Sequence, residues 1–268
     1  MAHPLKALLI TKGHPFEQEP FFAAFETWPD IDVTAVEQPA AQTFFAPDLA
    51  AEWDAFVFYD MPGIEFRREG GVRFHDPPAA HRKSFLALLE AGHGFVFLHH
   101  AIAGWPSWPE YAEILGGRFL YAPGELRGER YPDSGYQLGV THRVSPVGEH
   151  PILRGIEDGF EIEDELYLCK VFEDDVHPLL RSDARFEDDA FYSAAQAVAG
   201  KMFSREGWSH PAGSSLVGWW KYWGPSPIVY LALGDGPSAY AHPAFRTLVG
   251  NAIRWVGSAA RQPADDSV

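Results

Sequence analysis

Short, nearly unbroken apolar segments alternate along this chain with segments of helical periodicity. A strand of a parallel sheet that is buried on both faces has this continuous apolar pattern. Four segments fit it: 5–10, 53–59, 95–98 and 228–233. Residues 31–36 alternate between apolar and polar positions and are expected to form a further strand. Between these segments, residues 15–28, 77–92 and 243–256 carry apolar positions three or four residues apart, which is typical of helices packed on a sheet. This alternation predicts an α/β fold built from βαβ units.

The pattern changes over residues 117–215, where helical periodicity is weak and turn residues are frequent. Short strand-like runs remain at 136–141, 160–163 and 166–171, so we expect additional strands and long loops that elaborate the same domain. Residues 183–211 are expected to form a surface loop, and both a lid over a site and a mobile insertion fit their composition. We therefore predict one domain over residues 1–257 and a flexible tail over 258–268.

Composition and charge exclude several classes of partner and site. The 268 residues carry a formal charge of −16, which disfavours binding to nucleic acids or to an anionic membrane. The single cysteine, Cys169, excludes an intramolecular disulfide and a multi-cysteine zinc site, and its apolar flanks predict a core residue. The opening apolar run is too short for a secretory signal and no segment reaches transmembrane length, so a cytoplasmic protein is expected.

Polar residues follow the predicted strands at the point where each strand ends. The carboxyl ends of parallel strands meet at one edge of the sheet, where ligands bind in open α/β folds. The residues expected there are His14, Asp60, His99, His100, Asp235 and His242. His99 directly follows a buried strand, where a sharp turn would present one side chain above the sheet. Imidazole titrates near neutral pH, so His99 is a candidate acid, base or metal ligand.

A second cluster of candidates is the segment Asp164-Glu165-Leu166-Tyr167. Two carboxyl groups can divide acid and base roles when their surroundings separate their pKa values, although a solvated acidic edge is the alternative. Glu165 and Tyr167 would share one side of a strand. Trp105 lies in an aromatic patch that could stack on a sugar ring or pack on the core. No serine elbow, phosphate-binding loop or dinucleotide fingerprint occurs, so nucleophilic hydrolases and nucleotide-dependent enzymes lose support.

Several segments together resemble the ThuA-like (trehalose-utilisation) family, within the class I glutamine amidotransferase-like superfamily. They span residues 5–257 and are Gly13-His14, 94–101 with Leu-His-His-Ala, 108–119, 150–155, 164–167, 232–234, 242–245 and 251–255. The resemblance implies a flavodoxin-like three-layer sandwich with a mostly parallel central sheet and an elaborated second half. The nucleophile position of true amidotransferases is occupied by His99, and Ala244 replaces the glutamate that follows their His-Pro pair. Thiol-based glutamine hydrolysis is therefore expected to be absent.

The resemblance also suggests a substrate class. Relatives are associated with disaccharide catabolism, alongside dehydrogenases that oxidise sugars to 3-keto forms, which implies a keto-sugar or keto-glycoside substrate. Relatives often carry histidine where this chain has Asp235, so substrate choice or metal use could differ here.

These observations predict a cytoplasmic enzyme that transfers a proton beside a carbonyl group, giving isomerisation, elimination or hydrolysis. The predicted catalytic residues are His99, Glu165 and His14. The predicted substrate-binding residues are His100, Trp105, Asp60, Asp235, His242 and Tyr167. A divalent metal, zinc or manganese, held by His14, His99, Glu165 and His242 is left open. The expected partner is a small carbohydrate, self-association is left open, and the alternative function is a non-catalytic sugar-binding or regulatory module.

Overall fold

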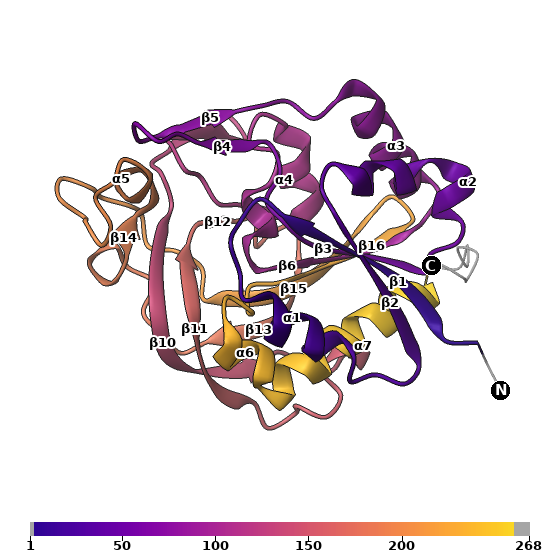
Figure 1. Cartoon of the computed structure of the whole chain (residues 1–268). Helices are drawn as coiled ribbons and strands as arrows, with labels where there is room; N and C mark the ends of the chain where they lie inside the picture. Colours follow the sequence, from indigo (N-terminus) through magenta and orange to yellow (C-terminus); the bar gives the residue numbers. More distant parts are fainter. Residues whose placement is uncertain (1–2, 260–268) are drawn as a thin grey trace.

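The computed structural model describes residues 3–259, and a single mixed sheet dominates its architecture (Figure 1). The strands along its main path lie in the order β11-β10-β13-β15-β16-β6-β3-β1-β2. Their bounds are β1 (Leu5–Lys12), β2 (Ile31–Glu37), β3 (Ala55–Asp60), β6 (Gly94–Leu98), β10 (Gly135–Pro146), β11 (Phe160–Leu168), β13 (His177–Ser182), β15 (Leu216–Trp223) and β16 (Ser226–Leu231). The short strands are β4 (Ile64–Phe66), β5 (Val72–Phe74), β7 (Gly117–Arg118), β8 (Gly124–Leu126), β9 (Glu129–Tyr131), β12 (Lys170–Val171) and β14 (Tyr192–Ser193).

The predicted α/β class and the elaborated second half are confirmed. The sheet is parallel from β2 through β1, β3 and β6 to β16, and antiparallel from β16 through β15, β13 and β10 to β11. Because β14 also pairs with β10 in antiparallel fashion, the sheet has four parallel and five antiparallel pairings and is mixed, where a mostly parallel sheet was expected. The predicted runs 160–163 and 166–171 become β11 and β12, because β11 continues through the acidic residues that separate the two apolar runs.

Helices cover both faces of the parallel half. Side chains alternate along each strand, so Phe56 and Phe58 enter one core while Val57 and Tyr59 enter the other. The helices are α1 (Gln18–Phe25), α2 (Pro47–Ala50), α3 (Ala79–Glu90), α4 (Pro109–Leu115), α5 (Ala194–Val198), α6 (Pro237–Ala241) and α7 (Pro243–Ala259). Helices α1, α6 and α7 lie on one side of the sheet and α2, α3 and α4 on the other (Figure 1). This gives the three layers expected for the fold.

Two excursions from the sheet lie close together at one end of the molecule. One is the β4–β5 hairpin, and the other is the segment containing β14 and α5 (Figure 1). The amide of Gly71 donates a hydrogen bond of 2.6 Å to the carbonyl oxygen of Val198 and thereby joins them. The predicted surface segment 183–211 thus includes a strand and a helix of its own. Within residues 3–259, no helix is long and apolar enough to cross a membrane.

Candidate active site

His99 stands at a sharp turn where β6 ends, as the sequence predicts. Its φ of 45° places the backbone in the left-handed region, which is uncommon for a residue other than glycine and is concentrated at functional sites. A 3-10 helix (His99–Ala103) begins there and turns the chain away from the sheet. The Tyr230 hydroxyl donates to the backbone carbonyl of His99 at 2.9 Å, so the neighbouring strand β16 supports the turn.

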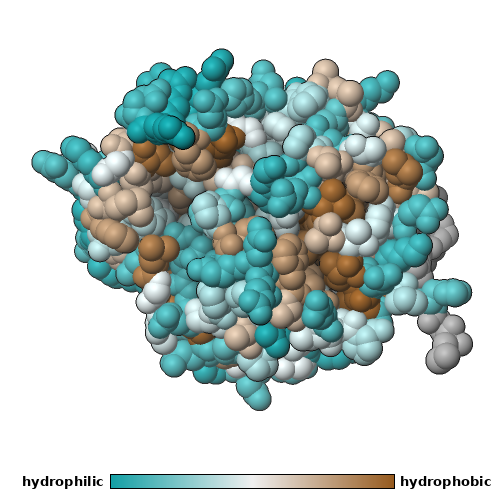
Figure 2. Space-filling model, viewed as in Figure 1, coloured by the Kyte–Doolittle hydropathy of each residue, from teal (hydrophilic) through white to brown (hydrophobic). Residues whose placement is uncertain are grey.

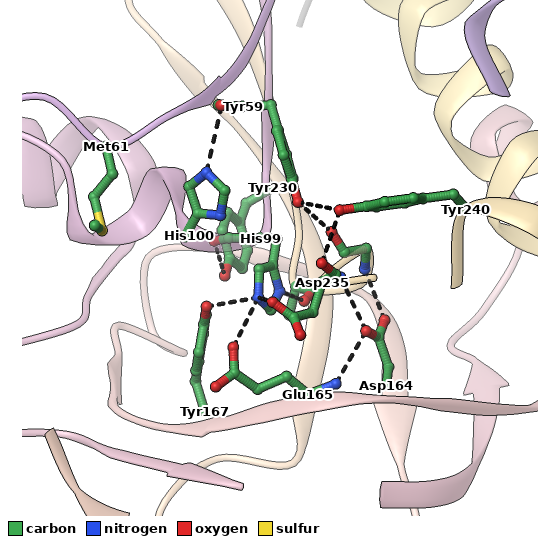
Figure 3. Close-up of polar contacts among 12 residues, drawn as sticks. Tyr59, Met61, His99, His100, Asp164, Glu165, Tyr167, Tyr230, Asp235 and Tyr240 are labelled. Atoms are coloured by element: carbon green, nitrogen blue, oxygen red, sulfur yellow. Dashed lines mark hydrogen bonds and ion pairs between the residues drawn. The ribbon is translucent and has the colours of Figure 1, made fainter. Parts of the chain in front are cut away.

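Both ring nitrogens of His99 have partners (Figure 3). Nδ1 lies 2.7 Å from the carbonyl oxygen of Ala232, which can only accept, so Nδ1 carries a hydrogen. Nε2 faces three oxygens: Glu165 Oε2 at 3.0 Å, Asp235 Oδ1 at 3.3 Å and the Tyr167 hydroxyl at 2.6 Å. Residues from β6, β11 and the loop after β16 therefore converge on one atom.

Charge and burial set the protonation of this cluster. Burial lowers the pKa of His99, but hydrogen bonds and charges from Asp235 and Glu165 outweigh it and raise the pKa well above its usual value. His99 is therefore an imidazolium at neutral pH, with Nε2 donating toward the carboxylates. Burial opposes ionisation of Asp235, yet its bond to His99 keeps the carboxyl pKa below the usual value. Burial and the charge of Glu165 raise the pKa of Tyr167, which keeps its hydroxyl proton.

Asp164 holds the loop that carries Asp235, a role that the sequence did not reveal. Its carboxylate accepts hydrogen bonds from the backbone amides of Gly234 at 2.7 Å, Asp235 at 3.0 Å and Glu165 at 3.0 Å (Figure 3). Burial raises the pKa of Asp164 to about 6. Since Asp164 and Glu165 point to opposite sides of β11, one strand segment both supplies the carboxylate beside His99 and anchors the opposite loop.

His14 and His100 extend the site on the side of β1. Their ring centroids are 4.8 Å apart, and His100 also packs against Tyr59 at 4.3 Å. Burial and the positive charge of His99 lower the pKa of His14, which therefore holds a neutral imidazole. His100 is buried, and its Nε2 lies 3.4 Å from the carbonyl oxygen of Tyr59.

A cavity of about 590 Å³ opens over this cluster. His14, Glu165, Tyr167 and Asp235 line its polar floor. The side chain of His99 is 0% exposed and that of Asp235 is 28% exposed. A ligand in the cavity would therefore contact the two carboxylates and the tyrosine, while the buried His99 contacts the same three side chains from the side facing the core. The volume suits a small molecule, since typical ligand pockets measure about 300–1,000 Å³.

The same cluster offers a set of metal-binding atoms. Among the described residues, His99, Glu165 and Asp235 each present one donor atom, and these atoms lie within 4.8 Å of one another. With the Nε2 proton of His99 released, one imidazole nitrogen and two carboxylate oxygens suit zinc or manganese, and a backbone partner on the other imidazole nitrogen is typical of metal-bound histidine. Of the four possible ligands named from the sequence, His99 and Glu165 belong to this set, whereas His14 and His242 do not, and Asp235 is its third member.

Five of the nine predicted site residues do not line the cavity. His99 and His100 contact residues that line it, and the other three are Asp60, Trp105 and His242. Asp60 is buried at the end of β3, where it accepts a hydrogen bond of 2.8 Å from Gln38 Nε2. Trp105 is buried with its ring 5.7 Å from that of His81, since its backbone is held by Pro62 and Arg118. His242 directly precedes the first residue of α7.

The position of His242 follows from the short helix α6, which lies between Asp235 and His242 in the chain. The His242 Nδ1 accepts a hydrogen bond of 3.2 Å from the amide of Ala244, so it caps the last helix as its place near the helix start predicts. Its ring packs 5.3 Å from that of Phe160, at the opposite end of β11 from Tyr167.

The walls of the cavity are not evident from the sequence. They come from the β4–β5 hairpin, β10, the segment after β7 and the α5 region, and consist of Pro15, Phe66, Phe119, Tyr121, Tyr136, Leu138, Ala194, Ala197, Val198 and Met202. The sequence indicates only part of this arrangement. The composition of residues 183–211 is compatible with a segment that covers a site, but its contact with this site depends on pairings between residues far apart in the chain.

No thiol takes part in this site. Cys169 is 7% exposed and packs in the core, and burial raises its pKa to about 12.

Comparisons with known proteins match this architecture. A family model described as "ThuA: Trehalose utilisation" matches residues 6–256. The fold is similar to a ThuA-like protein from Parabacteroides merdae, with 17% identity, a TM-score of 0.64, and coverage of 99% of this chain and 93% of the other. It is similar to a protein from Salmonella typhimurium described as cytoplasmic, with 12% identity, a TM-score of 0.56, and coverage of 94% and 99%.

A third similar structure is described as a GMP synthase protein from Thermoplasma acidophilum, with 11% identity, a TM-score of 0.50, and coverage of 96% of both chains. At this identity the likeness concerns the fold alone, which resembles that of class I glutamine amidotransferases. No curated protein matches the sequence.

Proposed function

The chain belongs to the ThuA family, whose description is "Trehalose utilisation", and we propose that it is an enzyme acting on a keto-sugar or keto-glycoside. The observation that carries the proposal is that Glu165, Tyr167 and Asp235 line the floor of the cavity and all three contact the buried His99. A fixed cation, carboxylates and a protonated phenol within hydrogen-bond reach are the groups that proton transfer beside a carbonyl requires.

In the proposed reaction, the substrate carbonyl oxygen accepts a hydrogen bond from Tyr167. The carboxylate of Glu165 removes the proton from the neighbouring carbon: the C–H bond breaks, its electrons form a C=C bond, and the carbonyl oxygen becomes an enolate. Tyr167 stabilises this oxygen, and the imidazolium of His99, 2.6 Å from the phenol oxygen, strengthens the phenol as a donor.

The enolate can react further in two ways. For isomerisation, the hydroxyl group on the neighbouring carbon gives its proton to the enolate oxygen, and Glu165 returns its proton to the former carbonyl carbon, so that the carbonyl group moves to the neighbouring carbon. Alternatively, the C–O bond to the leaving group breaks, the leaving oxygen takes the proton from Glu165, and elimination results. Water addition to the new double bond would complete a net hydrolysis. An acid and a base positioned in this way each contribute about 10²–10⁴-fold to the rate.

His14 and Asp235 are proposed to bind sugar hydroxyls. His14 presents a neutral imidazole, which can donate and accept, while the ionised Asp235 can only accept. His100 supports His14 from behind through their ring contact.

The proposal is tested by incubating the protein with a panel of 3-keto-glycosides and their parent sugars and detecting products by mass spectrometry. We expect turnover of at least one keto-glycoside, and at least about a 100-fold loss in Glu165→Gln and Tyr167→Phe. The matched control His242→Gln removes an imidazole outside the cavity and should keep its activity. Circular dichroism establishes that each variant is folded.

A protein that binds these compounds and converts none would instead be the non-catalytic sugar-binding module. We also propose that the protein acts in the cytoplasm, as the Salmonella structure is described. Fractionation that found the protein outside the cytoplasm would refute this location.

A further inference from the structure

The walls of the cavity differ in chemistry from its floor. Apart from the floor residues His14, Glu165, Tyr167 and Asp235, none of the lining residues carries a charged or amide side chain. The two hydroxyl groups in the walls already have partners. The Tyr121 hydroxyl lies 3.5 Å from Met61 Sδ, and the Tyr136 hydroxyl accepts from the amide of Phe203 at 2.9 Å.

The rim of the cavity exposes large apolar side chains, which is unusual for a surface without a ligand or partner. Among the described residues, six large hydrophobic side chains are markedly exposed: Leu49, Phe66, Leu138, Met202, Phe203 and Tyr222. Three of these line the cavity, namely Phe66 at 44%, Leu138 at 44% and Met202 at 53% exposure. Figure 2 shows brown and tan surface around a hollow in the region where Figure 1 draws β4, β5 and α5.

These walls suit a flat apolar group better than a second sugar ring. A sugar ring brings several hydroxyl groups, and the walls offer them only the hydroxyls of Tyr121 and Tyr136, so most would lose their hydrogen bonds to water without gaining a partner. An aromatic ring has no such groups, and the side chains of Phe119, Tyr121 and Tyr136 offer it faces and edges to pack against.

We infer that the substrate is a glycoside with an apolar, aromatic aglycone, whose sugar lies on the polar floor and whose aglycone lies between Phe66, Leu138 and Met202. The inference rests on the proposed function for the sugar end alone. The inferred substrate class differs from a disaccharide, because both sugar rings of a disaccharide need polar partners.

Binding is measured first, because it does not depend on turnover. Isothermal titration calorimetry uses three probes: phenyl β-glucoside, methyl β-glucoside and trehalose. We expect phenyl glucoside to bind at least about 10-fold more tightly than either of the others. Equal affinity for the phenyl and methyl glucosides, or tighter binding of trehalose, would overturn the inference.

Variants locate the preference at the rim. Leu138→Ser and Met202→Ser should each reduce the preference for the phenyl group at least about 3-fold, whereas Met202→Leu should keep it. Leu49→Ser and Tyr222→Ser are matched controls, since they remove exposed apolar side chains that do not line the cavity. Loss of the preference in the controls, or its persistence in both rim variants, would contradict the assignment.

Two further outcomes separate this inference from the proposed function. Preferential binding of phenyl glucoside without turnover of any 3-keto-glycoside would refute the enzyme and leave the ligand class supported. Turnover of 3-keto-glycosides with no effect of the aglycone would refute the ligand class alone. A dimer in solution that Met202→Ser dissociates would also refute it, because a second copy would then cover the rim.

Discussion

Replacing Asp60 by asparagine should remove a loss of stability that the wild-type protein suffers as the pH rises. Asp60 is 1% exposed, and burial raises its pKa to about 7 from an ordinary value of 3.8, against the opposing hydrogen bond from Gln38. The native state therefore holds a proton that the unfolded state releases between about pH 4 and pH 7. Stability is lost as the pH rises through this window, because the native state must then either ionise a buried carboxyl group or unfold.

The magnitude follows from the pKa. Between pH 5.5 and pH 8.5 the native group passes from protonated to ionised, while the unfolded group is ionised throughout. The loss is about 1.5 pKa units at 1.36 kcal/mol per unit, or about 2 kcal/mol. Asparagine does not titrate, and its oxygen can still accept from Gln38 Nε2. The NH₂ group of asparagine would take the place of Asp60 Oδ1, which has no hydrogen-bond partner among the described residues. Leaving this group unpaired lowers the free energy of unfolding by the same amount at every pH, so it does not change the pH dependence.

Urea unfolding followed by circular dichroism at both pH values measures this effect. The free energy of unfolding of Asp60→Asn relative to wild type should rise by about 2 kcal/mol from pH 5.5 to pH 8.5. Asp48→Asn, which replaces an exposed carboxylate, is the control and should follow the wild type. Parallel curves for Asp60→Asn and wild type would refute the reasoning.

Three further predictions concern the site and its supports. Asp164→Ala removes the acceptor for three backbone amides and should lower kcat/KM at least about 10-fold in the assay with keto-glycosides; unchanged kinetics would show that the loop holds its own shape. If the protein binds zinc or manganese, calorimetry should show that Asp235→Asn weakens the metal affinity at least about 10-fold and that His242→Gln leaves it unchanged. A weaker affinity in His242→Gln alone would contradict the assignment of Asp235 as a ligand. Gly13→Ala should lower the melting temperature more than Gly128→Ala, because both have positive φ but only at Gly13 would the new methyl group clash with a backbone carbonyl; equal shifts would contradict this.

The parallel half of the fold could be predicted because its central strands, such as β3, β6 and β16, are buried on both faces. Continuous apolar runs such as 95–98 stand out in any window, and the turn at His99 follows directly from where the run stops. The grouping of His99 with Asp235 also follows, since β6 and β16 are parallel neighbours and their carboxyl ends coincide.

Other positions depend on contacts that no local pattern encodes. The helix α6 carries His242 away from the sheet edge, and its five residues are too few to show a period. Trp105 turns into the core because its backbone adopts a φ of 46°, which the sequence does not signal. The cavity walls arise where β10, the β4–β5 hairpin and α5 meet, and these segments are far apart in the chain. Asp60 is a different case, because the alternation of side chains along β3 places it on the opposite side of the sheet from Tyr59, and this follows from the strand pattern alone.

The most direct test of the central claim is deuterium exchange at the carbon next to the carbonyl of a bound 3-keto-glycoside, followed by proton NMR in D₂O. The wild-type protein should wash out this proton signal, and Glu165→Gln should slow the exchange at least about 100-fold while still binding the compound. Exchange at the wild-type rate in Glu165→Gln, or no exchange above the rate without protein, would contradict proton transfer by the cluster of His99, Glu165 and Tyr167.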